Sequence, residues 1–570
     1  MKRVHYLATV AAVALSLPAA AQGQFYGGDD AVTGGGSGEG PPAASNSDGD
    51  SRRDGPVRKR AQVQPYIEAS HVVAAELSPG DDVVTYSQVA AGVDASVQGR
   101  NNGGSVSLRY ERNIGYDDAV LDSDTVTGVA RGYATIVPNE LTVEAGALAA
   151  RTQVDNGGGS SLDAVEGLGN DSESRIYSAY AGPNVTAKLG AADVTAAYRF
   201  GYTRVEAPDA VVTTPGAPPV DVFDESTLHS AHARLGIDPE AGVPFGAGIG
   251  AGYYQEDVDN LDQRVRDSYV RGDVTVPVGR TVRLVGGIGY EDVEVSSRDA
   301  LLDATGVPIV DDAGRFVTDE SSPRRIAFET DGLIWDVGVL WRPSTRTSFA
   351  AHYGRRYDSD TYYGSFAYAP DSRSSVNVSV YDRLSGFGGA INNALVALPT
   401  DFEATRNAVT GDLSGCVSSL EGGNCFGGSL ASVRSSAFRS RGGVLTYSQA
   451  VGRMSAGFGL GYDRRTFIAA PGSVLAAADG LTEESYYGNI FVSGPVGRTA
   501  GFTVNAYGAY LTSDFTDGAA TVLGTSASYN QQVYQGLSAR AAVSLDYLDS
   551  ETVGEDLKTA SALVGLRYDF

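Results

Sequence analysis

Long segments of this chain alternate apolar and polar residues with a period of two. In the segment 194–203, the apolar positions are Val194, Ala196, Tyr198, Phe200 and Tyr202, and the positions between them are small, polar or charged. The segments 106–111, 282–291, 502–510 and 539–547 follow the same pattern. Alternation sustained over about ten residues indicates a β-strand whose two faces meet different environments.

Three features favour a membrane-spanning barrel over a soluble sandwich, which would also alternate. The alternating segments run for about 10–15 residues, whereas strands of soluble proteins average about 5–6. The chain has 31 Tyr residues, which tend to fall at the ends of these segments, as aromatic girdles at membrane interfaces require. The last segment ends on Phe570. We therefore predict an all-β fold: a single transmembrane antiparallel β-barrel, which gives every backbone N–H and C=O in the membrane an internal partner.

The connectors between the segments provide an independent test. Tight turns such as 278–279 and 495–497 alternate along the chain with variable connectors, several of them long: 153–172, 206–225, 296–324, 385–434 and 468–482. Outer-membrane barrels of Gram-negative bacteria have short periplasmic turns and long extracellular loops. The barrel domain is predicted to span 63–570, with about 22 strands (20–22) near 64–77, 83–98, 103–116, 124–137, 139–152, 173–187, 191–205, 226–238, 244–257, 264–277, 280–295, 325–341, 345–357, 361–369, 373–384, 435–449, 453–467, 483–494, 498–513, 522–534, 538–549 and 556–570.

Residues 1–21 have the pattern of a secretory signal peptide. Lys2 and Arg3 precede an apolar run, 7–17, and small residues follow it. The run is shorter than the ~20 residues that a membrane-spanning helix needs. Such a peptide directs the chain through the inner membrane, on the way to the outer membrane. We expect its cleavage between Ala21 and Gln22.

The next segment, 22–62, is rich in Gly, Pro and Ser and is predicted to be a disordered periplasmic tail. A barrel of about 22 strands is wide enough to leak unless something fills it. One hypothesis is therefore that a basic cluster at the end of the tail enters the lumen and pairs with carboxylates there, while a free tail is the simpler alternative. The cluster consists of Arg52, Arg53, Arg58, Lys59 and Arg60.

Charged residues on the polar faces of the strands are predicted to face the lumen. One interpretation is a pore lining that selects solutes by charge. The alternative is that opposite charges pair across neighbouring strands and only stabilise the wall. The candidates are Arg109, Glu111, Arg199, Arg283, Glu291, Arg540, Asp546, Arg567 and Asp569.

The composition argues against several classes of function. The net charge of −26 argues against a nucleic-acid partner, because phosphate binding needs a basic surface. None of the 5 His residues belongs to a nucleophile or metal motif, so we expect no enzyme activity, no cofactor and no metal site.

The 2 Cys residues, Cys416 and Cys425, lie together in the longest predicted loop. We expect this loop to lie outside the cell. In an oxidising compartment, the pair predicts one disulfide that closes a small loop.

The terminal Tyr568-Asp569-Phe570 resembles the C-terminal signature of bacterial outer-membrane proteins, in which Phe is last and Tyr stands two residues before it. In that family the signature is recognised by the barrel assembly machinery. The resemblance therefore implies this machinery as a folding partner, and outer-membrane lipid and lipopolysaccharide as the surroundings of the folded protein.

A narrower resemblance is spread over most of the barrel. The segments 63–68, 85–95 and 106–112, and the segment Trp335-Asp336-Val337-Gly338-Val339-Leu340-Trp341-Arg342-Pro343-Ser344 followed by 352–357, resemble the outer-membrane barrel family associated with exosortase (PEP-CTERM) sorting. The resemblance implies a channel or outer-membrane component of an exopolysaccharide or protein export and sorting system, with other export components as partners. A nutrient porin for small solutes and a structural or adhesive barrel without transport are the alternatives. The tail 22–62 and the loop 385–434 depart from the family pattern.

Overall fold

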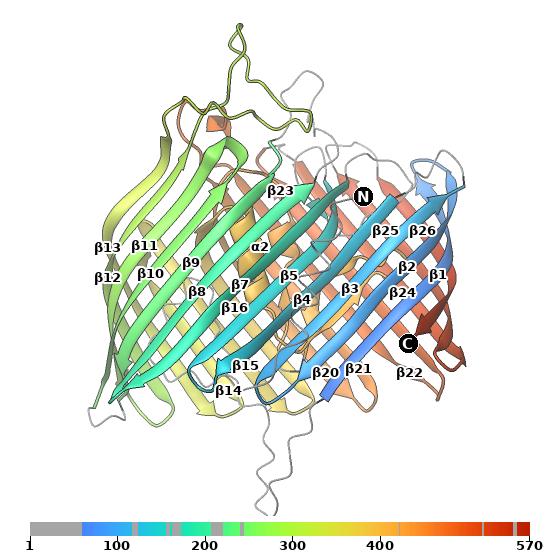
Figure 1. Cartoon of the computed structure of the whole chain (residues 1–570), viewed down its shortest axis with the longest axis horizontal. Coiled ribbons are helices and arrows are strands. Elements are labelled where there is room, and N and C mark those ends of the chain that lie inside the picture. Colours follow the sequence, from blue (N-terminus) through green and yellow to red (C-terminus); the bar gives the residue numbers. More distant parts are fainter. Residues whose placement is uncertain are drawn as a thin grey trace, which may run out of the picture.

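The computed structural model describes residues 60–116, 123–154, 160–161, 173–206, 221–239, 244–420, 422–515, 518–550 and 556–570. Within these residues, 22 long strands form one closed antiparallel ring around a lumen (Figure 1). The strands are β1 (Arg60–Ser78), β2 (Val83–Gln98), β3 (Asn102–Gly115), β4 (Ser123–Val137), β5 (Leu141–Val154), β7 (Glu173–Leu189), β8 (Ala192–Glu206), β9 (Glu225–Ile237), β10 (Gly246–Val258), β11 (Gln263–Pro277), β12 (Val282–Ser297), β13 (Arg325–Ser344), β14 (Thr347–Arg356), β15 (Ser359–Asp371), β16 (Ser374–Ser385), β20 (Phe438–Val451), β21 (Met454–Phe467), β22 (Thr482–Val496), β23 (Ala500–Ser513), β24 (Gly518–Tyr534), β25 (Leu537–Ser550) and β26 (Leu557–Asp569).

The ring closes where the first strand pairs with the last. β1 pairs with β26 from Tyr66↔Asp569 to Ser78↔Lys558, so neither strand has a free edge over this stretch. This closure gives the backbone groups of both strands partners inside the wall, which hydrocarbon requires. The predicted fold class is confirmed.

The predicted strands agree closely with the observed ones. All 22 are present, and most of their ends lie within three residues of the prediction. The largest differences are at β1 and β24, which begin at Arg60 and Gly518. Residues 60–62 therefore belong to the barrel and not to the preceding tail, which corrects that domain boundary.

The two ends of the barrel differ in the length of their connectors. At one end the turns are short, such as 278–281, 372–373 and 452–453, and at the other end long connectors such as 298–324 rise above the rim (Figure 1). This asymmetry places the short turns in the periplasm and the long connectors outside the cell. The protein is an integral outer-membrane β-barrel.

The outer face of the wall is apolar, with aromatic residues near its extracellular margin. Ile490 and Val564 are 59% and 68% exposed on this face. Tyr462, Tyr486 and Tyr510 lie opposite one another on β21, β22 and β23, with ring centroids 4.9 and 6.4 Å apart. This band marks the level of the outer membrane interface.

Glycine allows large lumen-facing side chains to lie flat against the wall. A Cβ atom on Gly92 would lie 2.4 Å from the ring of Tyr66, and one on Gly461 would lie 2.1 Å from the ring of Tyr487. Only glycine permits such a close approach. Part of the high glycine content, 72 residues, is explained in this way.

Shorter elements lie in the connectors. They are β6 (Ser160–Ser161), η1 (Asn260–Asp262), α2 (Phe387–Val396), β17 (Glu403–Arg406), β18 (Leu413–Ser418), β19 (Asn424–Cys425), η2 (Gly427–Leu430) and η3 (Ala476–Ala478). Among the described residues, no helix has the length and apolar character needed to cross a membrane.

We predict that a charge on the lipid face of β22 destabilises the barrel according to its depth. Ile490→Arg should lower the free energy of unfolding by about 2–4 kcal/mol, because an arginine near the bilayer midplane is poorly solvated. Val496→Arg, at the periplasmic end of the same strand, should cost about 0–1 kcal/mol. Urea titration of the barrel in phospholipid vesicles measures both values. Equal costs at the two positions would contradict the assigned membrane level.

Candidate functional site

The segment 386–437 between β16 and β20 folds back into the lumen. We call it the insertion. It leaves the wall at Ser385 and returns at Phe438, and these two residues pair with each other across β16 and β20. Most of its described side chains are buried, including Phe387, Ile391, Leu395 and Phe426. It contains α2, the three-stranded sheet β17–β18–β19 and η2.

The helix of the insertion begins on a carboxylate from the wall. Glu256 of β10 accepts hydrogen bonds of 2.8 Å from the backbone N–H groups of both Gly386 and Gly389. The hydroxyl groups of Tyr254 and Ser226 also donate to this carboxylate, at 2.7 and 3.2 Å. The first N–H groups of a helix have no partner within it, and negative charge there is favourable. Glu256 therefore caps the N-terminus of α2 and fixes this helix to the wall.

One side of the lumen binds the insertion through apolar contacts. Strands β4, β5, β7 and β8 turn apolar side chains inward, among them Leu148, Ile176 and Val205. These residues form one buried cluster with Phe387 and Ile391 of α2, and the cluster continues through the rest of the insertion. A water-filled pore would not need an apolar wall, so this patch is specific to a packed filler.

The stretch of wall next to this patch, from β24 through β1 to β4, binds the insertion mainly through polar contacts. Arg406 donates to the hydroxyl groups of Ser107 and Thr127, at 3.3 and 2.8 Å. The hydroxyl of Ser526 accepts a bond from the backbone N–H of Ala408, and Arg540 donates to the carbonyl of Ala408, at 3.0 and 2.6 Å. These hydrogen bonds join the insertion to β3, β4, β24 and β25. Ala408 and Val409 add a small apolar contact with β1, β2, β25 and β26.

A buried ion pair joins the insertion to β5. Arg151 and Asp412 lie 2.7 Å apart, and their side chains are 1% and 2% exposed. A second arginine bond, from the Nε atom of Arg151, reaches the other carboxylate oxygen at 3.2 Å. Removing one partner of such a pair leaves an uncompensated buried charge.

The insertion reaches the periplasmic end of the barrel. Ser105, close to the turn before β3, donates to the carbonyl of Thr400 at 3.1 Å and accepts from the N–H of Phe402 at 3.1 Å. Ser375, close to the turn before β16, donates to the carbonyl of Ser419 at 3.0 Å. The segment therefore extends through the lumen from its extracellular attachment to the level of the periplasmic turns.

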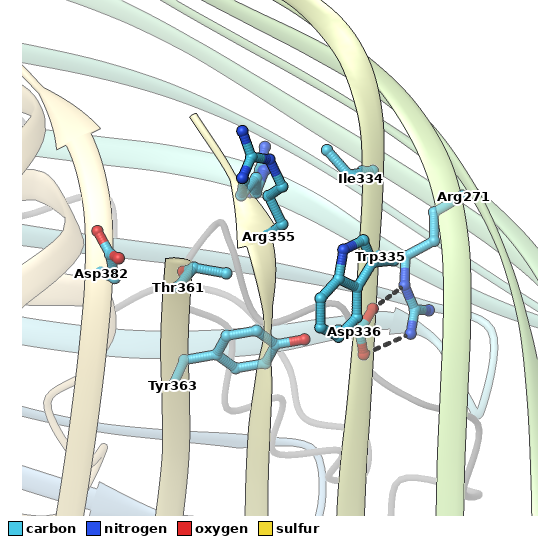
Figure 2. A pocket seen from close by; sticks show the side chains of 9 residues that line it. Arg271, Ile334, Trp335, Asp336, Arg355, Thr361, Tyr363 and Asp382 are labelled. Carbon is cyan, nitrogen blue, oxygen red and sulfur yellow. Dashed lines mark hydrogen bonds and ion pairs between the residues drawn. The ribbon is translucent and has the colours of Figure 1, made fainter. Parts of the chain in front are cut away.

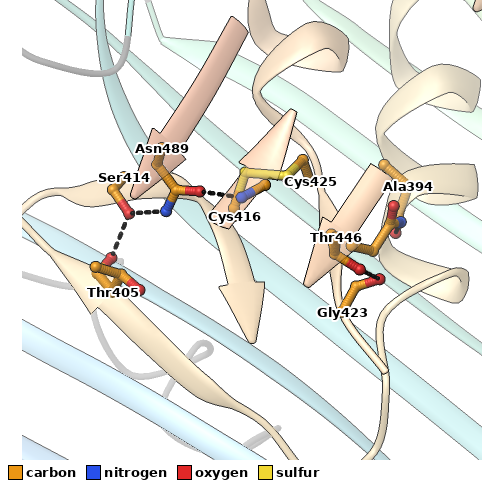
Figure 3. The surroundings of a disulfide bond; sticks show 10 residues. Ala394, Thr405, Ser414, Cys416, Gly423, Cys425, Thr446 and Asn489 are labelled. Atoms are coloured by element: carbon orange, nitrogen blue, oxygen red, sulfur yellow. Dashed lines mark hydrogen bonds between the residues drawn. A yellow bond between two sulfur atoms is a disulfide. The ribbon is translucent and has the colours of Figure 1, made fainter. Parts of the chain in front are cut away.

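The disulfide lies inside the barrel. Cys416 and Cys425 are bonded, on the neighbouring strands β18 and β19, and pack with Val444 against the lumen face of β20 (Figure 3). Gly459 of β21 leaves room for the sulfur atoms, since a Cβ there would lie 2.5 Å from one of them. The expected pairing is present, but the expected position outside the cell is wrong. The loop is nearly free of charge and packs inward.

The nine predicted lumen-lining residues all lie on strand positions that face the lumen. Three of them meet around Glu68, which the sequence analysis did not single out. Arg109 and Arg540 lie 3.2 and 2.6 Å from its carboxylate, and Glu111 lies 2.8 Å from Arg109. Arg567 and Asp569 form a separate ion pair at 2.9 Å. The other four are dispersed: Arg199, Arg283, Glu291 and Asp546.

A ladder of alternating charges crosses the lumen faces of β9, β11, β13 and β14. Arg234 contacts Asp273 at 2.8 Å, and Asp273 contacts Arg271 at 3.2 Å. Asp336 then accepts from Arg271 at 2.6 Å and contacts His352 at 3.2 Å. Regular alternation along each strand could have identified these residues.

The predicted basic cluster of the tail falls almost entirely outside the described residues, so the tail-plug hypothesis stays a prediction. Arg52, Arg53, Arg58 and Lys59 lie outside the described residues, and Arg60 is the first residue of β1, paired with Gln98. The described filler is the insertion. Its low charge is the signal that could have found it, since 386–437 holds only Asp401, Glu403, Arg406, Asp412, Glu421 and Arg434 as charged residues.

Extracellular connectors cover the top of the insertion. Asp221, before β9, accepts hydrogen bonds from the N–H of Phe316 at 3.1 Å and from the side chain of Asn260 at 3.3 Å. It also accepts from the hydroxyl of Ser435 in the insertion. We call this contact the latch, because it joins three connectors to the insertion through one carboxylate. Burial raises the pKa of Asp221 above its ordinary value, although its hydrogen bonds oppose the shift.

Comparison with known proteins gives matches only among solved structures. No family model and no curated protein matches the chain. The FrpB iron transporter of Neisseria meningitidis matches with 11% identity over 88% of this chain and 81% of that chain, at a TM-score of 0.40. The siderophore receptor PiuA of Acinetobacter baumannii matches with 8% identity over 89% of this chain and 82% of that chain, at a TM-score of 0.38. The ferric-catecholate import receptor Fiu of E. coli matches with 9% identity over 88% of this chain and 81% of that chain, at a TM-score of 0.40. Such values support no statement about a ligand or a mechanism.

We predict that Asp412→Ala lowers the free energy of unfolding by up to about 3–5 kcal/mol, because it removes the nearer carboxylate from the buried guanidinium of Arg151 and leaves Glu173 at 3.7 Å. Urea titration in vesicles measures this loss. The double variant Arg151→Met/Asp412→Leu, which replaces the pair by apolar groups, should recover most of it. A double variant as unstable as the single one would show that packing, rather than the unpaired charge, sets the cost.

We predict that the latch weakens as pH rises. Since the pKa of Asp221 in the latch lies above its ordinary value, its stabilisation is complete at pH below the ordinary value and is lost as pH rises through the raised pKa. Between about pH 4 and pH 8, hydrogen exchange at the N–H of Phe316 and Phe223, corrected for the intrinsic rate, should become faster. Asp221→Asn, which does not titrate, should remove this trend. A trend of equal slope in both proteins would rule out Asp221 as its cause.

Proposed function

We propose that the protein is a gated conduit for small polar solutes across the outer membrane, with the insertion as its gate. The observation that carries the proposal is that a covalently attached segment fills the lumen from its extracellular attachment to the periplasmic turns. A surface anchor could be built on a narrower barrel that its own side chains fill, whereas a wide barrel closed by a separate segment can open when that segment moves. Nutrient uptake is therefore favoured over a purely structural or adhesive role.

The two halves of the insertion differ in how easily they can move. The half containing α2 is held by apolar side chains, whose exposure to water is costly. The half containing β17 and the turn at 407–412 is held mainly by hydrogen bonds to serine, threonine and arginine, which water can replace at small net cost. The buried pair of Arg151 and Asp412 and a small apolar cluster around Val409 also have to separate when this half moves. We infer that this second half moves and that α2 stays on the wall.

The size of this movement favours small solutes over polymers. Displacing the half that contains β17 opens a passage beside β3, β4 and β24. It takes Phe402, Leu413 and Val417 out of the apolar cluster and leaves α2 packed against the wall. A polysaccharide or an unfolded protein would require the whole insertion to leave the lumen, with exposure of Ile391, Leu395 and their neighbours. The export role implied by the resemblance to the exosortase-associated family remains the second hypothesis. Its test is whether deletion of the gene reduces exopolysaccharide secretion.

We predict that removal of the insertion opens the barrel. In a planar bilayer, the refolded wild type should conduct little, whereas a variant that joins Ser385 to Phe438 by an Asn-Gly turn should show a large steady conductance. The turn fits because these two residues already pair across β16 and β20.

Two controls separate this gate from other fillers. Deletion of 298–324, joined at the paired residues Ser297 and Arg325, should leave the low conductance unchanged. Deletion of 22–59 tests the alternative tail plug. A large conductance in the wild type, or one that appears only when the tail is removed, would overturn the proposal.

A further inference from the structure

The barrel wall extends least far toward the extracellular side at the hairpin of β14 and β15. This hairpin turns at Tyr357 and Asp358, both with positive φ, 53° and 54°. β13 pairs with β14 only from Trp335 downward, so its extracellular half, 325–334, rises above the hairpin with β12 as its one partner in the described sheet. We call this low stretch of wall the notch.

The other side of the notch is a split between β15 and β16. Their backbone pairing begins at Gly364↔Val380 and continues only toward the periplasm. Above it, side chains bridge the two strands instead. Arg439 and Arg441 of β20 reach across β16 and donate to the carbonyl of Asp360, at 3.3 and 2.8 Å. Backbone groups in a membrane wall are normally all paired, so this stretch is the least sealed part of the ring.

The notch lies at the level of the extracellular membrane–water interface. Tyr353 and Tyr362 face each other directly below the hairpin tip, and they are 48% and 45% exposed on the outer face. The ring of Trp335 lies beside that of Tyr353, with centroids 6.1 Å apart. These rings mark the level at which lipid head groups meet acyl chains.

A pocket opens in the notch. Its lining combines outer-face residues with lumen-face residues, and it is an open hollow whose enclosed part is small, about 20 Å³. Figure 2 shows Tyr363 of β15 with its hydroxyl directed toward the paired Arg271 and Asp336. The lining residues are Arg271, Ile334, Trp335, Asp336, Arg355, Arg356, Thr361, Tyr363 and Asp382.

The acceptors of this pocket are already occupied. Asp336 accepts two bonds from Arg271, at 2.6 and 2.8 Å, and contacts His352. Asp382 accepts two bonds of 2.7 Å from Arg439 and one of 3.1 Å from Arg441. Neither carboxylate is left to receive a ligand's donor.

Donors remain. Among the described residues, no group bonds the hydroxyl of Tyr363, although the atom is buried. Arg355 contacts Asp358, whose side chain is 72% exposed, at 2.7 Å, and such surface pairs are weak. A guanidinium has five N–H donors, and within the described part of the chain Asp358 is the one carboxylate paired with Arg355, so further donors can serve a ligand. The pocket therefore suits a group that only accepts hydrogen bonds.

We propose that the notch is a binding site for an anionic amphiphile of the outer leaflet. The anionic head, a carboxylate or a phosphate, lies between Arg355 and the hydroxyl of Tyr363. The acyl chain runs down the outer face of β13 beside Val337, which is 55% exposed, within the hydrocarbon. This site does not depend on the gating role of the insertion.

The two tryptophans of the chain allow a direct test. Trp335 lines the pocket, and Trp341 lies on the same face of β13 toward the periplasm, about 20 Å along the strand. In phosphatidylcholine vesicles, the variant Trp341→Phe reports on the notch alone, and Trp335→Phe is the matched control. The probes are dibromostearate, brominated phosphatidic acid and brominated phosphatidylcholine, whose bromine atoms quench a nearby indole.

The expected result is saturable quenching of Trp335 by an anionic probe at a low fraction in the membrane, reversed by the unbrominated compound. Saturation by dibromostearate identifies a free fatty acid as the source, and saturation by phosphatidic acid identifies a lipid head group. Tyr363→Phe and Arg355→Gln, each made in the Trp341→Phe background, should weaken binding about tenfold, because each removes a hydrogen bond to a charged group.

The proposal is overturned if quenching of Trp335 rises in proportion to probe content for all three probes, as it should for Trp341. Equal binding by zwitterionic phosphatidylcholine would also overturn it. Unchanged heat-modifiable migration of both variants on gels shows that they fold, so that a loss of binding is not a loss of the barrel.

Discussion

Every backbone group inside a bilayer needs a partner within the protein, and this requirement determines the rest of the structure. It forces the strands into a closed ring, completed by the pairing of β1 with β26. A ring of this many strands encloses a lumen too wide for its own side chains to fill. The same constraint that closes the wall therefore creates a second problem, which is how to keep the membrane sealed. The insertion between β16 and β20 solves it with a segment that is already tethered.

A filler inside a polar lumen has to be fixed without becoming part of the wall. The chain uses both kinds of contact for this. An apolar patch on the lumen face of β4–β8 holds α2, and Glu256 fixes the start of that helix. Elsewhere most contacts of the insertion are with hydroxyl and guanidinium groups that water can also solvate, beside the buried pair of Arg151 and Asp412 and a small apolar cluster around Val409. The exchangeable contacts are thus concentrated in one half, and this is the half that we infer to move.

The fold could be predicted from sequence because its signals are local. Alternation within a strand depends on neighbours two residues apart, and it located each of the 22 strands. The place of the insertion depends on residues far apart along the chain: Arg151 and Asp412 are separated by 261 positions, and Glu256 and Gly386 by 130. No periodicity reports such contacts. The pairing of Cys416 with Cys425 was accessible because only two cysteines exist, but its position inside the lumen was not.

The weakest part of the wall and the filler of the lumen meet in one strand. β16 loses its backbone pairing with β15 above Val380, and it continues directly into α2 after Ser385. Its other edge stays fully paired with β20, up to Ser385↔Phe438. The strand end from which the insertion leaves the wall is therefore free on one side, bridged there by arginines from β20 rather than by a ladder. Because α2 holds its place on the wall, the other half of the insertion can move without pulling on this end. Since side-chain bridges exchange with water more readily than a continuous ladder, we expect the notch to open before any other part of the ring.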